Sequence, residues 1–466
     1  MKLLLIGSGG REHALLWKLK QNPRITECYV APGNAGTGTM AVNVPIEATN
    51  IAGLLQFAQE KKIDLTIVGP DDPLAAGIVD QFQEAGLRIF GPTAAAARFE
   101  SSKSFAKDFM KRHGIPTAAS ETFTSSEKAS AYVRQAKYPL VVKADGLALG
   151  KGVIIAQSAE EALTAIKEMM EEKVFGAAGE TIVIEEFLTG PECSLHALID
   201  GKNYLLFPDA RDHKRALDGD QGLNTGGMGT ISPSGLLHHS TTDAHCCVAP
   251  VLAPSSMNDT LSRCAPEAPG TASPAANAAK GLIVRKSMRA RLHEEIFVPF
   301  LRGLAAEKIK FQGMLFPGLM LTKDGPKVLE FNARFGDPET QVLMRRLHSD
   351  LLELLEATID EKLDTVSPWW DQRPAVCVVL ASGGYPGSIE KGKPITGLES
   401  VNNANVAIFH AGTKQVEENI VTNGGRVLGV TALGRTLEEA RQAAYAAADQ
   451  IQFEGKQFRR DIGATV

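Results

Sequence analysis

The sequence has little cysteine, few aromatic residues and no long apolar run. Six cysteines spread unevenly over 466 residues do not form a disulfide framework, so we expect a reducing, cytoplasmic environment. No apolar stretch approaches the roughly 18 residues that span a bilayer. The apolar run Leu3–Ile6 ends at Gly7, so we expect no signal peptide either. A net charge of −5 gives no reason to expect nucleic acid as a partner.

The rest of the composition is ordinary for a globular protein. Hydrophobic residues make up 44% of the chain and charged residues 22%, which argues against disorder throughout and against a collagen-like chain. At roughly 100–200 residues per domain, the length predicts two to four domains. We expect a monomer that acts on small molecules, away from any membrane.

Short apolar runs alternate with helical spacing through the first hundred residues. This alternation predicts a parallel sheet with helices on both faces, whose glycine-rich turns lie at the carboxyl ends of the strands, where such folds bind ligands. The predicted strands are Lys2–Ile6, Glu27–Ala31, Leu65–Val68 and Leu87–Phe90, and the predicted helices are Arg11–Gln21, Ile51–Glu60 and Leu74–Ala85.

The residue pattern changes at Ser101, and the last segment is rich in predicted strands. We therefore expect three domains at 1–100, 101–336 and 337–466. In the second domain we predict helices at Lys103–His113 and Ala159–Glu172, strands at Tyr138–Ala144, Val153–Ala156 and Thr181–Phe187, and a hairpin of Gly313–Thr322 and Pro326–Phe331. In the third we predict strands at Val376–Ala381, Val406–His410 and Arg426–Ala432 and a helix at Leu437–Ile451.

The segment Ser234–Ala290 differs from its surroundings. It is rich in Ala, Pro, Ser and Thr, lacks a period of 2 or 3.6, and contains Cys246, Cys247 and Cys264. We interpret it as an inserted or disordered surface loop that leaves the fold intact and reduces activity. An error in the sequence is the alternative that composition leaves open.

The turn Gly7–Gly10 lies between a predicted strand and a predicted helix. Backbone N–H groups at the start of a helix bind anions. A dinucleotide-binding turn would have a third glycine at position 12, where Glu12 stands, and no acidic residue ends the second strand. We therefore favour a phosphate group over NAD. A tight turn without a ligand is the plainer alternative.

Lys143 lies inside an apolar strand, where a lysine needs a strong partner. The glycine-rich stretch Asp145–Gly152 follows at once and contains Lys151. Such a loop can lie over a polyphosphate and supply N–H donors and positive charge. It is not a Walker A loop, because the spacing is wrong and no Ser or Thr follows the lysine. The alternative is an exposed hairpin with a solvated lysine.

Two acidic residues, Glu185 and Glu186, end another apolar strand. Adjacent residues of a strand point to opposite faces, so one of the two carboxylates faces the interior or a cleft. Glu192, just beyond Gly190-Pro191, could accept a hydrogen bond from a sugar hydroxyl. A strand end with solvated acids is the alternative.

A mixed-charge run, Arg211–Arg215, is followed by the glycine-rich stretch Asn224–Gly229. This combination suits a substrate that carries both signs of charge, although a charged run alone is usually a solvated surface.

Glu330, Asn332 and Arg334 occupy alternate positions, so on a strand they project from one face. A carboxylate beside an amide oxygen suits Mg²⁺, and an arginine beside them can stabilise a phosphoryl group during transfer. A polar sheet face in contact with water is the alternative, but it would show a less ordered mixture of residues.

The lysine strand, the glycine-rich loop, the Glu-Glu strand end and the Glu-Phe-Asn strand resemble the ATP-grasp superfamily in that order. Within it, longer motifs are similar to the phosphoribosylamine–glycine ligase family. These are Gly7–Ala14, Asp212–Arg215, Asn224–Gly229, Asn332–Gln341, His410–Thr413, Thr422–Gly429 and Arg459–Gly463. Departures from the family are Asp71 in place of its usual Glu, Ala94 in place of a frequent Lys, and Ser234–Ala290 in place of a short connection.

The resemblance implies an α/β chain with an N-terminal Rossmann-like parallel-sheet domain, ATP-grasp α+β domains and a strand-rich C-terminal domain. It also implies a reaction in which ATP, glycine and 5-phosphoribosylamine give glycinamide ribonucleotide through glycyl phosphate, with Mg²⁺ or Mn²⁺. Other hypotheses are another ATP-grasp carboxylate–amine ligase of nucleotide metabolism, a nucleotide-binding protein inactivated by the inserted segment, or an NAD oxidoreductase.

Site residues follow from the resemblance position by position. For ATP these are Lys103, Lys143, Gly150, Lys151, Gly152, Glu185, Glu186, Leu188 and Glu192, and for the metal Glu330 and Asn332. For the phosphoribosylamine they are Gly9, Gly10, Asn224, Thr225, Gly226, Gly227, Met228 and Gly229. Asp212, Lys214 and Arg334 are expected to line the glycine and acyl-phosphate site and to be catalytic.

Overall fold

The computed structural model describes residues 1–147, 152–237 and 287–464. Gly150, Lys151 and most of the segment expected as an insertion, with Cys246, Cys247 and Cys264, lie outside these ranges. Within them, no helix is both long and apolar enough to cross a membrane.

The N-terminal residues form the expected parallel sheet, with strand order β3-β2-β1-β4-β5. Leu3 and Leu5 of β1 belong to one apolar cluster, whereas Leu4 and Ile6 belong to another, so both faces are covered. The elements are β1 (Lys2–Gly7), α1 (Gly10–Leu19), β2 (Glu27–Pro32), β3 (Val42–Asn43), α2 (Ile51–Lys61), β4 (Leu65–Val68), α3 (Asp71–Ala75), α4 (Ile78–Glu84) and β5 (Ile89–Phe90).

The single helix expected at Leu74–Ala85 is wrong. The chain forms two helices, α3 and α4, and the break is at Gly77, which has a φ of +82°. Glycine adopts positive φ without steric cost. In the sequence Gly77 only weakens the helical pattern, but in the structure it ends the helix. α3 also begins earlier than expected, at Asp71.

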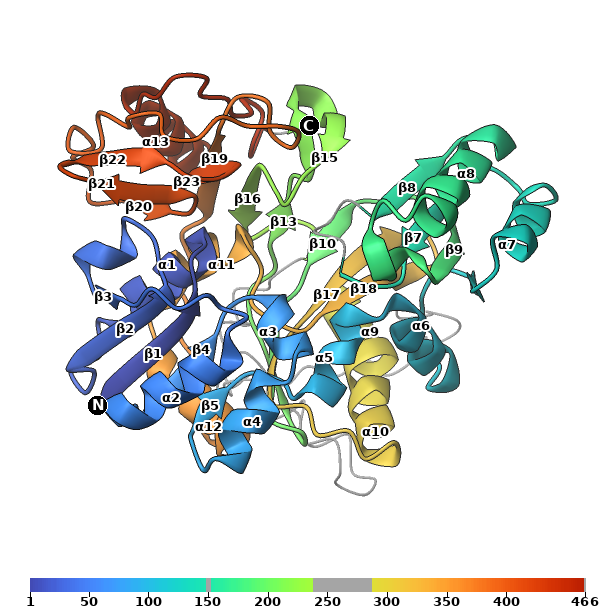
Figure 1. Cartoon of the computed structure of the whole chain (residues 1–466), viewed down its shortest axis with the longest axis horizontal. Coiled ribbons are helices and arrows are strands. Elements are labelled where there is room, and N and C mark those ends of the chain that lie inside the picture. Colours follow the sequence, from blue (N-terminus) through green and yellow to red (C-terminus); the bar gives the residue numbers. More distant parts are fainter. Residues whose placement is uncertain (148–151, 238–286, 465–466) are drawn as a thin grey trace, which may run out of the picture.

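The central part contains two antiparallel sheets. The first has the order β6-β9-β7-β8 and projects with α7 and α8 from one end of the molecule (Figure 1). The second has the order β10-β17-β11-β12, with β18 paired to β17 in the predicted hairpin. The elements before the second sheet are α5 (Ala94–Ser101), α6 (Lys103–Arg112), β6 (Ser120–Phe123), α7 (Ser126–Val133), β7 (Leu140–Ala144), β8 (Val153–Ala156), α8 (Ala159–Ile166) and β9 (Ile182–Glu186). Those from the second sheet onward are β10 (Glu192–Ser194), β11 (Ala197–Ile199), β12 (Tyr204–Leu206), α9 (Met288–Leu292), α10 (Val298–Ala306), β17 (Gly313–Thr322) and β18 (Gly325–Asn332).

A further sheet joins the middle of the chain to its end, because its strand order is β13-β16-β19-β23-β20. Two hairpins form separate two-stranded sheets, and α11 packs against both α1 and β23. The elements are β13 (Arg211–Asp212), β14 (Arg215–Leu217), β15 (Gln221–Asn224), β16 (Gly229–Ser232), α11 (Glu339–Arg346), α12 (Leu351–Ile359), β19 (Ala375–Ala381), β20 (Val406–His410), β21 (Thr413–Val416), β22 (Asn419–Thr422), β23 (Arg426–Leu433) and α13 (Leu437–Gln450).

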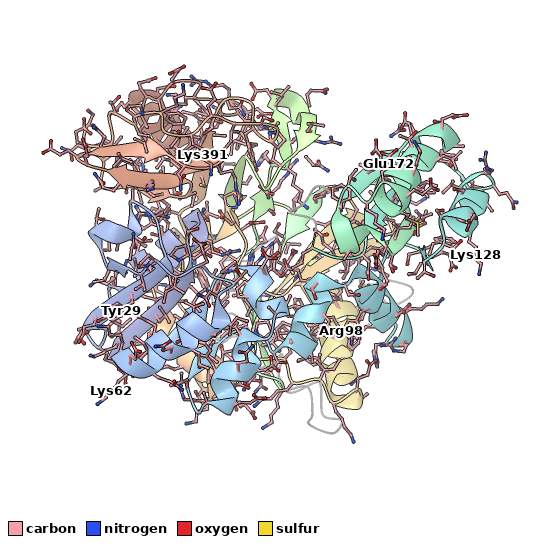
Figure 2. The ribbon with its side chains drawn as sticks, in the orientation of Figure 1. Tyr29, Lys62, Arg98, Lys128, Glu172 and Lys391 are labelled. Carbon is pink, nitrogen blue, oxygen red and sulfur yellow. The ribbon has the colours of Figure 1, made fainter. Side chains whose placement is uncertain are left out.

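Charged side chains far from the centre are scattered over all parts of the fold. Figure 2 shows Lys62, Lys128, Glu172 and Lys391 on the outside of the molecule, and all four are exposed. The charged residues considered next differ from them, because most are partly or fully buried near the centre of the molecule.

Candidate active site

A pocket lies where β10, the β13–β14 segment and the β17–β18 hairpin meet. Five of the predicted site residues line it although they are far apart in the sequence: Glu192, Asp212, Lys214, Glu330 and Asn332. Ser194 and Phe316 contribute to the same wall. The structure therefore brings together acidic, basic and amide side chains that the sequence analysis assigned to one site.

Glu330 and Asn332 lie on β18 at the edge of this pocket. Burial alone would raise the pKa of Glu330, but the ammonium groups of Lys214, Lys143 and Lys103 lower it, so the carboxylate is ionised at neutral pH. The amide nitrogen of Asn332 donates to the carbonyl of Phe316 at 3.3 Å, which leaves its oxygen as an acceptor. The pair offers the hard oxygen atoms that Mg²⁺ prefers.

Arg334 does not lie on the strand as expected, because β18 ends at Asn332. It nevertheless reaches the same region, since its Nη2 atom lies 3.4 Å from Oδ1 of Asn332. The same atom forms an ion pair at 3.1 Å with Glu100, and the carboxylate of Glu100 also accepts the N–H of Ala333 at 2.7 Å. Glu100, which was not predicted from the sequence, therefore holds the guanidinium group of Arg334 beside Glu330 and Asn332.

Lys143 has the strong partner that its apolar strand requires. Its ammonium group lies 3.1 Å from Oε1 of Glu185 and donates to the carbonyl of Leu329 at 3.2 Å. The other carboxylate oxygen of Glu185 pairs at 3.0 Å with Lys107, which the sequence analysis missed. Burial lowers the pKa of Lys107 to about 8 although Glu185 opposes the shift. The three groups are almost wholly buried.

The start of the glycine-rich loop holds α6 in place. The carboxylate of Asp145 accepts the N–H of Ser104 at 2.6 Å, so it caps that helix. Lys103 donates to the carbonyl of Gly146 at 3.2 Å, and its pKa is lowered by burial, with Glu330 opposing the shift. Gly152, at the far end of the loop, accepts the N–H of Ala144.

The side chains of Glu185 and Glu186 point to opposite faces of their strand, as predicted. Glu185 points inward, whereas Glu186 is exposed, pairs with Lys327 at 3.0 Å and accepts the N–H of Ala119. Leu188 is buried in a small apolar cluster. Glu192 lies on the pocket wall, 3.6 Å from the ammonium group of Lys214.

Asp212 and Lys214 face the pocket, whereas His213 between them is buried and its ring lies 3.1 Å from the carbonyl of Gly229. Burial would lower the pKa of Lys214, but Glu192, Glu330 and Asp212 raise it, so the lysine stays charged. Burial and the nearby Glu339 raise the pKa of Asp212. Its Oδ1 atom is buried and has no hydrogen-bond partner among the described residues.

The stretch Asn224–Gly229 turns closely around Asp212. Gly227 has a φ of +112°, and a Cβ atom there would lie 2.7 Å from Oδ1 of Asp212 and 2.5 Å from Pro338. Thr225 donates through both its N–H and its hydroxyl to the carbonyl of Lys214. Met228 is fully buried, so its side chain belongs to the core rather than to the face of the turn.

In the turn Gly7–Gly10, a side chain of the helix that follows, α1, takes up one of the turn's own N–H groups. The N–H of Gly9 donates to the carboxylate of Glu12 at 2.6 Å, and Arg11 pairs with the same carboxylate at 2.5 Å. A glutamate at the third helical position commonly reaches back in this way, and this explains why Glu12 replaces a glycine. A phosphate group at this turn would meet the Glu12 carboxylate at Gly9.

In this arrangement, lysines and oxygen ligands lie together between antiparallel sheets, as they do in a known class of proteins. An ATP-grasp domain model matches residues 101–254 and 270–340, so the class is ATP-grasp. The biotin carboxylase domain of Hydrogenobacter thermophilus 2-oxoglutarate carboxylase has the same fold, with a TM-score of 0.67 at 15% identity, covering 98% of this chain and 91% of that one.

More specific matches cover nearly the whole chain. The N, ATP-grasp (A) and C domain models of phosphoribosylglycinamide synthetase match residues 1–100, 101–254 with 270–340, and 375–465. The chain belongs to the phosphoribosylglycinamide synthetase family.

Individual relatives support the same family assignment. The phosphoribosylamine–glycine ligase of Vibrio vulnificus (strain CMCP6) is 50% identical, covering 99% of this chain and 98% of that protein. The corresponding protein of Yersinia pestis is 48% identical, with the same coverage. The crystal structure of phosphoribosylamine–glycine ligase from Thermotoga maritima superposes with a TM-score of 0.76 at 33% identity, covering 99% of this chain and all of that one.

Proposed function

We infer that this chain is an ATP-dependent ligase of de novo purine synthesis that joins glycine to 5-phosphoribosylamine. The products are glycinamide ribonucleotide, ADP and phosphate. The observation that carries this conclusion is the gathering of Lys214, Glu330 and Asn332 in one pocket, with Lys143 adjoining it, in a chain whose whole length matches this family.

The chemistry needs two displacements. A carboxylate oxygen of glycine attacks the γ-phosphorus of ATP, and the bond to ADP breaks, giving glycyl phosphate. The sugar amine then attacks the glycyl carbonyl carbon, phosphate leaves, and the amine loses a proton. Catalysis of such transfers is mainly positioning and neutralisation of charge. The acyl phosphate must also be shielded from water.

ATP is held by the basic side of the site. Lys103 and Lys143 would contact the phosphates, and the stretch Gly150–Gly152 would lie over them. The buried pair with Glu185 supports this role, because it fixes the ammonium group of Lys143 next to Glu330. The backbone after Glu185, through Glu186 and Leu188, would meet adenine, with Glu192 on the ribose.

Glu330 and Asn332 would hold Mg²⁺ or Mn²⁺. The ionised carboxylate of Glu330 and the amide oxygen of Asn332, which accepts a 3.4 Å hydrogen bond from Arg334, are a suitable donor set, and both residues lie on the pocket wall. When bound, the metal neutralises charge on the transferring phosphoryl group.

Asp212, Lys214 and Arg334 would bind glycine and its phosphorylated form. The buried Oδ1 atom of Asp212 lacks a partner among the described residues, which suits an incoming ammonium group. Lys214 and Arg334 both have pKa values above their ordinary ranges, because acidic neighbours outweigh burial, so both remain cationic beside the developing charge.

The phosphoribosylamine would lie between the turns Gly9–Gly10 and Asn224–Gly229. We further propose the domain limits 1–100, 101–336 and 337–466, and a monomer that acts in the cytoplasm without nucleic acid. The excess of acidic over basic residues supports the last point.

A product assay with the wild type and Arg334→Ala tests the function. We expect ADP formation to require both glycine and phosphoribosylamine, and Arg334→Ala to lower kcat by roughly 100-fold or more. Arg373→Ala is the control, since Arg373 pairs with Asp371 away from the pocket. Turnover with formate or bicarbonate in place of glycine would favour another carboxylate–amine ligase. ATP binding without product would indicate an inactivated protein.

A further inference from the structure

Arg426, the first residue of β23, belongs to a motif to which no role has been given above. Its Nη1 atom donates to the carbonyl of Gly226 at 2.5 Å and to the carbonyl of Asp337 at 2.6 Å. Its Nη2 atom forms an ion pair with the carboxylate of Asp337 at 3.2 Å. One guanidinium group therefore connects the Gly226–Gly227 turn to the segment that follows β18.

The Gly226 turn is held from both sides by the C-terminal part of the chain. While its carbonyl accepts from Arg426, its N–H donates to the hydroxyl of Tyr385 at 3.0 Å. A Cβ atom on Gly226 would lie 3.1 Å from the guanidinium carbon, so the turn rests directly on the arginine. The bidentate, planar geometry of arginine suits this task better than the single point charge of lysine.

Asp337 extends the connection to the N-terminal turn. A Cβ atom on Gly9 would lie 3.2 Å from Oδ2 of Asp337, the oxygen that pairs with Arg426. The other oxygen accepts from Gln341 at 2.7 Å, and the amide of Gln341 lies 2.6 Å from the Cβ position of Gly10. The two turns assigned to the phosphoribosylamine thus face opposite sides of one ion pair.

Both members of the pair are ionised. Burial would raise the pKa of Asp337, but Arg426 and Arg11 lower it, and the pKa of Arg426 is raised by Asp337 against the effect of burial. The fold supports this connection, because α11, which follows Asp337, packs against α1 and also against β19 and β23.

We propose that Arg426 is a positioning residue for the sugar phosphate, which holds the Gly226–Gly227 turn against the Gly9–Gly10 turn through Asp337. This inference rests on the proposed function. Arg426 sets the affinity for phosphoribosylamine and leaves the nucleotide side of the site unchanged, because the contacts that hold Lys103, Lys143 and Glu185 in the described part of the chain are made with other residues.

Steady-state kinetics of Arg426→Gln and Arg426→Lys test this role. Phosphoribosylamine is formed in place from ribose 5-phosphate and ammonia, and each substrate is varied in turn. We expect Arg426→Gln to raise the KM for phosphoribosylamine by roughly tenfold or more, with the KM for ATP changed less than about twofold. Arg426→Lys keeps the positive charge but lacks the planar guanidinium group with its several donors. Its KM for phosphoribosylamine should lie between those of the wild type and Arg426→Gln. Lys391→Ala, an exposed change in the same part of the chain, should match the wild type.

A binding measurement separates positioning from general loss of structure. Ribose 5-phosphate should raise the Tm of the wild type, and that increase should be lost in Arg426→Gln while the increase given by ATP is retained. Equal KM values for phosphoribosylamine in wild type and both variants would overturn the inference and leave the proposed function standing. A parallel loss of ATP and sugar phosphate binding would also overturn it. A wild type that makes no product would overturn both.

Discussion

The two halves of the site are built differently. On the side proposed for the nucleotide, Lys107, Glu185 and Lys143 form buried ion pairs between an α-helix and neighbouring β-strands. On the side proposed for the sugar, glycine turns present backbone groups, and Arg426 with Asp337 contacts these turns from a distant part of the chain. The first half therefore depends on charge balance in a nonpolar interior, and the second on the shape of two turns.

This difference predicts two kinds of sensitivity. Removing one member of a buried ion pair leaves an uncompensated charge, which strongly destabilises the fold. Displacing a turn by about 1 Å leaves the fold stable but removes the substrate from its reactive position. The expected effects decrease in the order below.

Glu185→Ala should have the largest effect. It would leave the ammonium groups of Lys107 and Lys143 buried without their common partner, and we expect a loss of about 3–5 kcal/mol in the free energy of unfolding. Urea denaturation measures this, and ATP affinity should fall in parallel. A loss no larger than that of an exposed ion pair would contradict the account of the nucleotide side.

Gly227→Ala should lower catalysis beyond what the strain of a side chain at positive φ costs in stability. A methyl group at this position meets both Asp212 and Pro338, and the φ of +112° disfavours any side chain. We expect kcat/KM for phosphoribosylamine to fall about 100-fold, with ATP affinity unchanged. The matched control is Gly219→Ala, also at positive φ but with no atom of the described residues within 4 Å of the new methyl group.

Acid should destabilise the contact between α1 and β20, where two buried histidines meet. His13 accepts the N–H of His410 at 2.8 Å, and burial lowers the pKa of His13 to about 3 and of His410 to about 4. The unfolded chain binds protons at both sites near pH 6.5, so stability is present at pH 7 and is lost as the pH falls toward 4.

His13→Asn keeps an acceptor for the N–H of His410 and removes one of these titrations. We expect the loss of stability between pH 7 and pH 5 to be about 2 kcal/mol smaller than in the wild type, measured by urea denaturation at each pH. An unchanged pH dependence would show that His13 is not the group that titrates.

Glu186→Ala should have the smallest effect and serves as the control for Glu185→Ala. Its ion pair with Lys327 is partly exposed, so we expect a loss of about 0–1 kcal/mol. A large loss would remove the distinction between the two neighbouring glutamates.

Much of this architecture follows from local pattern. The parallel N-terminal sheet, the β17–β18 hairpin and the inward lysine of β7 were all predicted, because each rests on spacing within a few residues. The break at Gly77 was not, since a single glycine in a periodic stretch is compatible with a continuous helix.

The residues that were not predicted are mainly those that bind site residues far away in the sequence. Lys107, at helical spacing from Lys103, carried a weak signal, because residues four apart share one face of a helix. Glu100 carried no such signal. Glu339 and Arg426 lie in family-like motifs, but the motifs alone assigned them no role, since their importance comes from Asp212 and Asp337 on other elements. Tertiary contact, rather than composition, makes these residues part of the site.

The sheet β13-β16-β19-β23-β20 has a consequence for dissecting the protein. Its strands come from both sides of residue 336, and β16 pairs with β19 along its whole length. A fragment ending at residue 336 would leave the edge of β16 without its partner strand and should aggregate. Two fragments produced together, however, should reassociate through that edge, so the halves of this chain are suited to complementation experiments but not to separate purification.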